Sequence, residues 1–75
     1  MTTYLKKTQL EEIYGISLCT VNDRIKRIRP LVGKRYPLDS IISTGRFVRV
    51  RGDVFKDMML YKDLIEYGAA PKFHE

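Results

Sequence analysis

Apolar residues recur at helical spacing near the start of the chain and predict a short helix there. Leu10 and Ile13 share one face of this helix. Thr8 and Glu11 have the spacing of a capping box, so we expect the helix to begin at Thr8. Gly15 follows at the point where a residue in the left-handed conformation can end a helix. The first predicted helix is therefore about two turns long.

A second helix is predicted between Ser17 and Pro30. Ser17 is a favourable N-cap, and a proline disfavours helical backbone in the residue before it. Val21, Ile25 and Ile28 lie at i, i+4 and i+7, so they form a narrow apolar stripe that faces the core. The opposite side is polar and charged, and it carries Cys19, Thr20, Asp23, Lys26 and Arg27, with Asn22 and Arg24 on its flanks.

A β-hairpin is predicted in the second half of the chain. Residues 41–43 and 47–51 are rich in β-branched side chains, and Gly45 between them suits a tight turn. Val48 and Val50 alternate with the side chains of the other face of the second strand. That other face is basic with an aromatic at its edge, and it consists of Phe47, Arg49 and Arg51.

A third helix is predicted to follow the hairpin and to end at Gly68. Gly52 and Asp53 offer a break and an N-cap. The core stripe of this helix is Val54, Met58, Tyr61 and Ile65, with Phe55 and Met59 on one flank and Leu60 and Leu64 on the other. We expect the flank of Leu60 and Leu64 to be an exposed contact surface for a protein partner or another copy. The alternative is that Leu64 belongs to the core.

The order helix, helix, hairpin, helix predicts an α+β fold, a small winged helix-turn-helix with three helices and a two-stranded hairpin as its wing. A chain of 75 residues has room for one domain. We place that domain at residues 1–67 and expect residues 68–75 to form a flexible C-terminal tail. The expected core consists of Leu10, Ile13, Ile16, Val21, Ile25, Ile28, Val48, Val50, Val54, Met58, Tyr61 and Ile65.

The chain is basic, with 14 Lys and Arg against 9 Asp and Glu, a net charge of +5 and a pI near 9.6. This favours an anionic partner such as nucleic acid or a membrane surface. No apolar run approaches the ~20 residues that span a bilayer, so we expect no membrane partner and a cytoplasmic protein. Cys19 is the only cysteine, so we expect no intramolecular disulfide and no Cys-based metal site. Cys19 and His74 are too far apart in sequence for a catalytic pair, so we expect no cofactor and no enzymatic activity.

Residues 10–25 resemble the helix-turn-helix of lac-repressor-like bacterial regulators. The likeness lies in the short apolar-faced helix, Gly-Ile-Ser at the turn and Thr-Val in the second helix. It implies that positions 18, 19, 22 and 23 approach base edges while Ser17 and Thr20 hold phosphates. Leu18 and Cys19 offer only apolar contact, for instance with a thymine methyl. Hydrogen-bond readout then falls to Asn22, Asp23, Lys26 and Arg27.

Two of these residues have a second interpretation, and other basic residues extend the predicted surface. Phosphates repel Asp23, so we favour a pair with Arg27 over a contact to cytosine. Cys19 fits equally well as a half-buried small residue at the helix start. Residues 30–38 form a predicted loop. This loop and the hairpin add Lys34, Arg35, Arg46 and Arg49 to the DNA-binding candidates.

The whole arrangement resembles the small winged-helix excisionases of phages and integrative elements, which are related in fold to MerR-type regulators. The likeness covers the size, the order of elements and the hairpin-then-helix segment from Ile41 to Ile65. It implies a protein that binds and bends double-stranded DNA, binds cooperatively beside further copies, and assists a recombinase or integrase. Two alternatives stay open: a transcriptional repressor or DNA-packaging recognition subunit, and a protein-interaction adaptor that binds no DNA.

Overall fold

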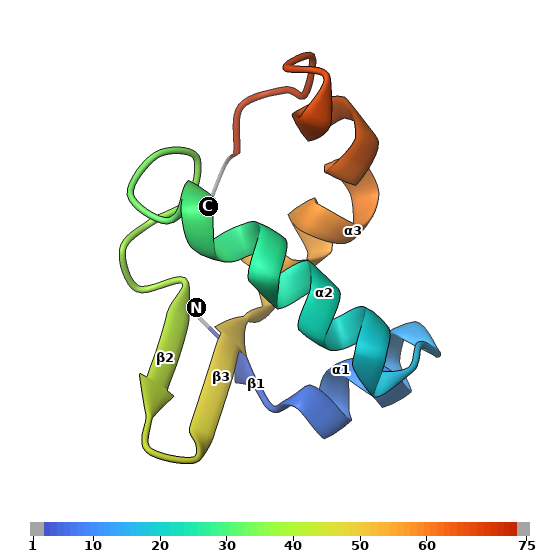
Figure 1. Ribbon diagram of the computed structural model, residues 1–75, viewed down its shortest axis with the longest axis vertical. Helices are drawn as coiled ribbons and strands as arrows, with labels where there is room; N and C mark the ends of the chain where they lie inside the picture. Colours follow the sequence, from blue (N-terminus) through green and yellow to red (C-terminus); the bar gives the residue numbers. More distant parts are fainter. Residues whose placement is uncertain (1–2, 74–75) are drawn as a thin grey trace.

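Three helices and a three-stranded antiparallel sheet make up the fold of this computed structural model, which describes residues 3–73. In Figure 1 the helix α2 crosses the front of the molecule, and the β2–β3 hairpin projects to one side of it. This is the predicted α+β arrangement of a small winged helix, with the hairpin as the wing. The elements are β1 (Tyr4–Leu5), α1 (Lys7–Tyr14), α2 (Leu18–Ile28), the 3-10 turn η1 (Arg29–Leu31), β2 (Ile41–Thr44), β3 (Phe47–Arg51) and α3 (Gly52–Glu66).

The sheet contains one strand more than the sequence predicts. β1 pairs with β3 through Tyr4 opposite Arg51 and Leu5 opposite Val50, so the strand order is β1-β3-β2. A strand of two residues is too short to show a period of alternation, and only its partner on β3 defines it. This added strand joins the start of α1 to the base of the hairpin.

The hairpin is closed by a short connection of fixed register. Thr44 and Phe47 are the last pair of the ladder, so only Gly45 and Arg46 lie between β2 and β3. Gly45 has a φ of 57°, which a residue without a Cβ adopts easily. A glycine at the first position of such a loop suits the twist of the two strands. The tip of the wing is therefore a two-residue turn.

The turn between α1 and α2 forms as predicted. Gly15 ends α1 in the left-handed conformation, with a φ of 62°. Ser17 caps α2, because its Oγ accepts a hydrogen bond from the Thr20 amide at 3.3 Å. The two helices of the helix-turn-helix are thus joined by a turn whose backbone groups have partners.

The start of α1 differs from the prediction. The helix begins at Lys7 and not at Thr8. The Lys6 amide donates to Oε1 of Gln9 at 2.8 Å, so Gln9 takes the capping role expected of Glu11. Because β1 pairs with β3, the chain is already positioned just before the helix, and the first turn can form one residue earlier.

The core lies where α1, α2 and α3 meet the sheet. Its buried residues are Leu10, Val21, Ile25, Ile28, Tyr36, Val50, Val54, Phe55 and Met58. The predicted place of Ile13 in the core is wrong, because this residue is 59% exposed. Instead α1 turns Tyr14 inward, and its ring packs on Phe55 with the centroids 5.3 Å apart. Ile16, Val48, Tyr61 and Ile65 are half-buried.

The helix α3 begins earlier than predicted and contains a kink. It starts at Gly52, so Asp53 lies in the first turn and is not the N-cap. The Asp53 carboxylate instead binds the Arg51 guanidinium and accepts the Val54 amide at 2.9 Å. Tyr61 departs from helical geometry, with φ −119° and ψ 15°. All the buried residues of α3 precede this kink.

The two flanks of α3 differ in exposure. Phe55 is buried and Met59 is half-buried, whereas Leu60 is 63% exposed and Leu64 is 43% exposed. The alternative assignment of Leu64 to the core is therefore wrong. The role of Leu60 and Leu64 as a contact surface stays a prediction.

The segment after α3 contacts the domain through one aromatic side chain. Phe73 meets the Tyr36 ring edge-on, with the centroids 5.2 Å apart. The boundary after residue 67 and the flexibility of the tail stay predictions, and His74 lies outside the described residues. None of the helices within residues 3–73 is long and apolar enough to cross a membrane.

The contrast between Ile25 and Ile13 gives a direct test of the core. Ile25 is 4% exposed, so Ile25→Ala leaves a cavity and should lower the free energy of unfolding by about 2–5 kcal/mol. Ile13→Ala makes the same chemical change at an exposed site and should cost less than about 1 kcal/mol. Urea denaturation followed by circular dichroism measures both variants. Equal losses would contradict the packing of α1 and α2 described above.

Candidate nucleic-acid interface

The helix α2 presents a line of exposed side chains that continues into the following turn. Cys19, Asn22, Lys26 and Arg29 are exposed and follow one another at spacings of three and four residues. The apolar stripe of α2 lies on the opposite side, in the core. Because Cys19 is exposed, its alternative interpretation as a half-buried residue is wrong. This line is the part of α2 that a ligand can reach.

The start of α2 is open to solvent. Ser17 is exposed, and its Oγ lies 3.2 Å from Oγ1 of Thr20. Leu18 beside it is 46% exposed. Backbone amides in the first turn of a helix have no acceptor within the helix and attract anions. Of the two residues that the helix-turn-helix resemblance assigns to phosphate contacts, Ser17 is exposed and Thr20 is half-buried.

Asp23 and Arg27 have partners inside the chain. Nε of Arg27 donates to Oδ2 of Asp23 at 3.0 Å, which confirms the predicted pair. Arg27 also donates to Glu66 of α3, and Arg24 donates to Asp23. The hydrogen bond from Arg27 lowers the pKa of the Asp23 carboxyl below its ordinary value. Arg27 thus joins α2 to α3, Asp23 holds two arginines of its own helix, and reading a base would require both side chains to give up these ion pairs.

Arg35 is also occupied within the fold, although the sequence places it in an exposed loop. Its guanidinium donates to both carboxylate oxygens of Asp57, at 3.0 and 3.2 Å. The Tyr36 hydroxyl donates to the same carboxylate at 2.8 Å, and burial together with this contact raises the pKa of Tyr36. Lys34, its neighbour in the loop, is exposed and has no ion pair among the described residues.

Arg51 is the second arginine whose surroundings differ from the prediction. Its side chain is 5% exposed and not part of an open basic face. It binds Asp39 at 3.0 Å and Asp53 at 2.8 Å. The Tyr4 hydroxyl donates to Asp39 as well, and these two hydrogen bonds lower the pKa of the Asp39 carboxyl. A buried guanidinium needs such partners, and the sequence pattern of the strand does not show them.

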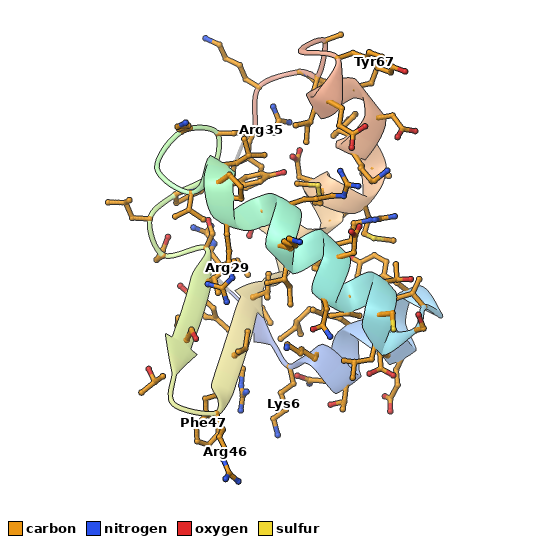
Figure 2. All side chains as sticks on the ribbon, viewed as in Figure 1. Lys6, Arg29, Arg35, Arg46, Phe47 and Tyr67 are labelled. Carbon is orange, nitrogen blue, oxygen red and sulfur yellow. The ribbon has the colours of Figure 1, made fainter. Side chains whose placement is uncertain are left out.

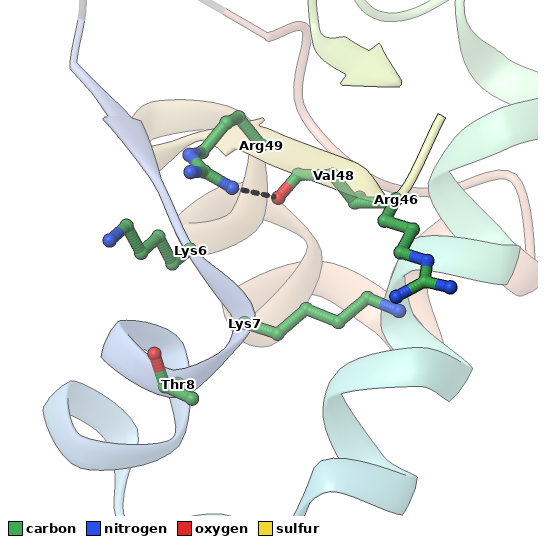
Figure 3. Close-up of a pocket in the computed structure, with 6 residues that line it drawn as sticks. All are labelled: Lys6, Lys7, Thr8, Arg46, Val48 and Arg49. Atoms are coloured by element: carbon green, nitrogen blue, oxygen red, sulfur yellow. Dashed lines mark hydrogen bonds between the residues drawn. The ribbon is translucent and has the colours of Figure 1, made fainter. Parts of the chain in front are cut away.

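Four basic residues without an acidic partner line a cleft between the start of α1 and the wing. The cleft has a volume of about 240 Å³ and is lined by Lys6, Lys7, Thr8, Arg46, Val48 and Arg49. Figure 3 shows the ends of Lys7 and Arg46 pointing toward each other across it. None of the lining residues is acidic, and no ion pair within residues 3–73 involves the four cations.

The cleft and the end of α2 share one side of the molecule. In Figure 2 Lys6, Arg29 and Arg46 lie below α2, whereas Arg35 and Tyr67 lie above it. Arg35, on the upper side in Figure 2, is paired with Asp57, whereas no ion pair within residues 3–73 involves Lys6, Arg29 or Arg46.

Three basic residues at these sites are not among the DNA-binding candidates predicted from the sequence: Lys6, Lys7 and Arg29. No sequence signal marks Lys6 and Lys7, because only the pairing of β1 with β3 brings them beside the hairpin. The structure places Arg46 and Arg49 at the cleft and Lys26 on the exposed line of α2.

Comparison of the chain with protein-family models, with curated proteins and with solved structures finds no match in any of the three. A function for the chain is therefore inferred from its own side chains and their arrangement.

The Arg35–Asp57 pair can be tested by removing its carboxylate. Asp57→Asn leaves a largely buried guanidinium without its charge partner and should lower the free energy of unfolding by about 3 kcal/mol. Asp63→Asn is the control, because this acid of α3 is 81% exposed and should cost less than about 0.5 kcal/mol. Denaturant titrations of both variants give the two values. An unchanged free energy of unfolding for Asp57→Asn would contradict the structural role of Arg35. Arg35 would then be available to bind an anion.

Proposed function

We propose that the protein is a non-catalytic winged helix-turn-helix DNA-binding protein. In this proposal α2 enters the major groove of duplex DNA, and the wing with the start of α1 holds the sugar-phosphate backbone. The observation that carries it is the cleft that Lys6, Lys7, Arg46 and Arg49 line without an acidic residue. The binding step proposed here is common to an excisionase, a repressor and a packaging recognition subunit.

Electrostatics supports an anionic partner for the cleft. Cations held close together repel one another, and a bound anion relieves this repulsion. Asp39 and Asp53 already have an arginine partner in Arg51, and no acidic residue lines the cleft. Phosphates of a DNA backbone are evenly spaced anions that can occupy both the cleft and the start of α2. A single small anion would satisfy only one of these two places.

The exposed line of α2 supplies groups that suit base edges. The Asn22 amide can form two hydrogen bonds with adenine, and the Lys26 ammonium can donate to guanine. Cys19 and Leu18 offer apolar contact, while Ser17 and Thr20 are placed for phosphates. Arg27 and Asp23 are left out of the readout because they pair with each other and Arg27 also pairs with Glu66 of α3.

The exposed flank of α3 provides the protein contact in this proposal. Leu60 and Leu64 follow one another by one helical turn, and both are exposed to solvent. They face away from the core, so a recombinase or an adjacent copy on the same DNA can contact them without disturbing α2 or the wing. This part of the proposal depends on exposure alone, and DNA binding does not require it.

The dependence of binding on salt tests the main proposal. With about five phosphates covered, log K should fall against log salt with a slope near −4.5. Lys7→Ala and Arg46→Ala should each weaken binding and make the slope shallower by about 0.9, because each removes one phosphate contact. Fluorescence anisotropy with a labelled random-sequence duplex pool measures affinity and slope.

Lys56→Ala is the matched control for these two changes. Lys56 is an exposed lysine of α3 that is not part of the cleft and has no ion pair among residues 3–73. Its removal should leave both affinity and slope nearly unchanged. Equal effects of Lys56→Ala and Lys7→Ala would indicate attraction by net charge only, and a wild-type slope near zero would favour the adaptor alternative.

Asn22 tests the orientation of α2. After a preferred duplex has been selected from the random pool, Asn22→Ala should weaken binding to it by about 1–3 kcal/mol and relax the choice of one base pair. The melting temperature should not change, since Asn22 is exposed. Repeating the selection with the variant gives the readout. An unchanged preferred sequence would place a different face of the protein in the groove.

A further inference from the structure

The tip of the wing carries an exposed aromatic side chain between two arginines. Phe47 is 63% exposed, although it is the first residue of β3 and a member of the last pair of the hairpin ladder. Arg46 precedes it in the connection, and Arg49 follows it on the same face of the strand. Figure 2 shows Phe47 and Arg46 together at the free end of the hairpin, away from the core. The ring therefore contributes nothing to the interior of the domain.

The position of this ring is held by its surroundings. The Arg49 guanidinium carbon lies 5.0 Å from the centroid of the Phe47 ring, which is within the range of a cation–π contact. Nη1 of Arg49 also donates to the carbonyl of Val48 at 3.1 Å, so the guanidinium itself is fixed. The short connection at Gly45 limits movement of the tip. The ring belongs to the first residue of a paired strand and contacts a guanidinium that is itself hydrogen-bonded to the backbone.

Arg49 belongs to two features at once. It lines the basic cleft and also lies over the Phe47 ring. A DNA backbone bound in the cleft therefore runs next to the ring. Cations on both sides also disfavour an apolar protein surface as the partner, because burying Arg46 or Arg49 without an anion is costly.

We propose that Phe47 is a wedge that enters the minor groove of the bound duplex, partly unstacks one base step and so bends the DNA. This inference rests on the proposed DNA-binding function and adds a residue that sets the bend. Apolar side chains inserted between base steps kink duplexes toward the major groove, at a cost that the extra contacts of the bent DNA offset. Flexible pyrimidine–purine steps are the sites that take such a wedge most easily. Arg46 and Arg49 bind the phosphates on either side of that step.

The experiment compares Phe47→Ala with Phe47→Leu on a duplex that the wild-type protein has selected from a random-sequence pool. Energy transfer between dyes at the two DNA ends reports the bend, and 2-aminopurine at the contacted step reports unstacking. Phe47→Ala should abolish the protein-induced rise in both signals and weaken binding about tenfold. Phe47→Leu keeps an apolar wedge and should retain most of the bend. The salt slope should stay the same in both variants because neither removes a charge.

Ile42→Ala is the matched control. Ile42 is 43% exposed and pairs with Arg49 across the hairpin, so it offers a similar loss of apolar surface farther from the tip. It should bend DNA as the wild type does, and melting curves should show all three variants folded. If Phe47→Ala bends and unstacks the duplex like the wild type, the wedge is overturned while the cleft variants still report on DNA binding. If the wild type itself shows no salt-dependent affinity for duplex DNA, both the proposed DNA-binding function and the proposed role of Phe47 are refuted.

Discussion

The buried guanidinium of Arg51 is the interaction on which the arrangement of the other elements depends. It binds Asp39 of the loop before β2 and Asp53 of the first turn of α3, and its own strand pairs with β1 at Tyr4. The Tyr4 hydroxyl closes the set by donating to Asp39. One charged group therefore holds together both neighbours of the central strand and the start of the last helix. Removing either carboxylate would leave a charge in a place that water reaches poorly, which is why these partners occur together.

This network determines where the basic cleft can form. Because β1 is held beside β3, the start of α1 lies next to the wing, and Lys6 and Lys7 meet Arg46 and Arg49 across the cleft. Arg35 and Arg27 bind Asp57 and Glu66 on the side of α3, so the carboxylates are used where they neutralise arginines. The four cations of the cleft are left without an acidic partner among the described residues. A modest net charge can in this way produce a strong local field.

Rigidity matters as much as charge for the proposed contacts with DNA. Gly15 and Ser17 fix the angle between α1 and α2, and the two-residue connection at Gly45 fixes the end of the wing. A domain of this size buries little apolar surface, so leaving large apolar side chains exposed lowers the stability that burial could provide. Phe47 and Leu60 are nonetheless exposed to solvent, and we propose that the first contacts DNA and the second a protein. Phe47 lies at the end of a hairpin, and Leu60 lies on the exposed flank of α3 just before the kink at Tyr61, so both are clear of the core.

The sequence by itself determined the local elements: the helices from spacing and caps, the turn at Gly15, the hairpin from alternation, and the Asp23–Arg27 pair from their separation along one helix. These features depend on neighbours within a few residues, so a linear pattern is enough to predict them. Only the tertiary structure decided which residues of each face are covered and which arginines stay free. Ile13 is exposed because Tyr14 and Leu10 take the inner side of α1, and Arg35 and Arg51 are occupied because distant aspartates reach them. The basic cleft likewise needs a two-residue strand to bring residues 6 and 7 to residues 46 and 49, and pairing at that distance along the chain leaves no local pattern to detect.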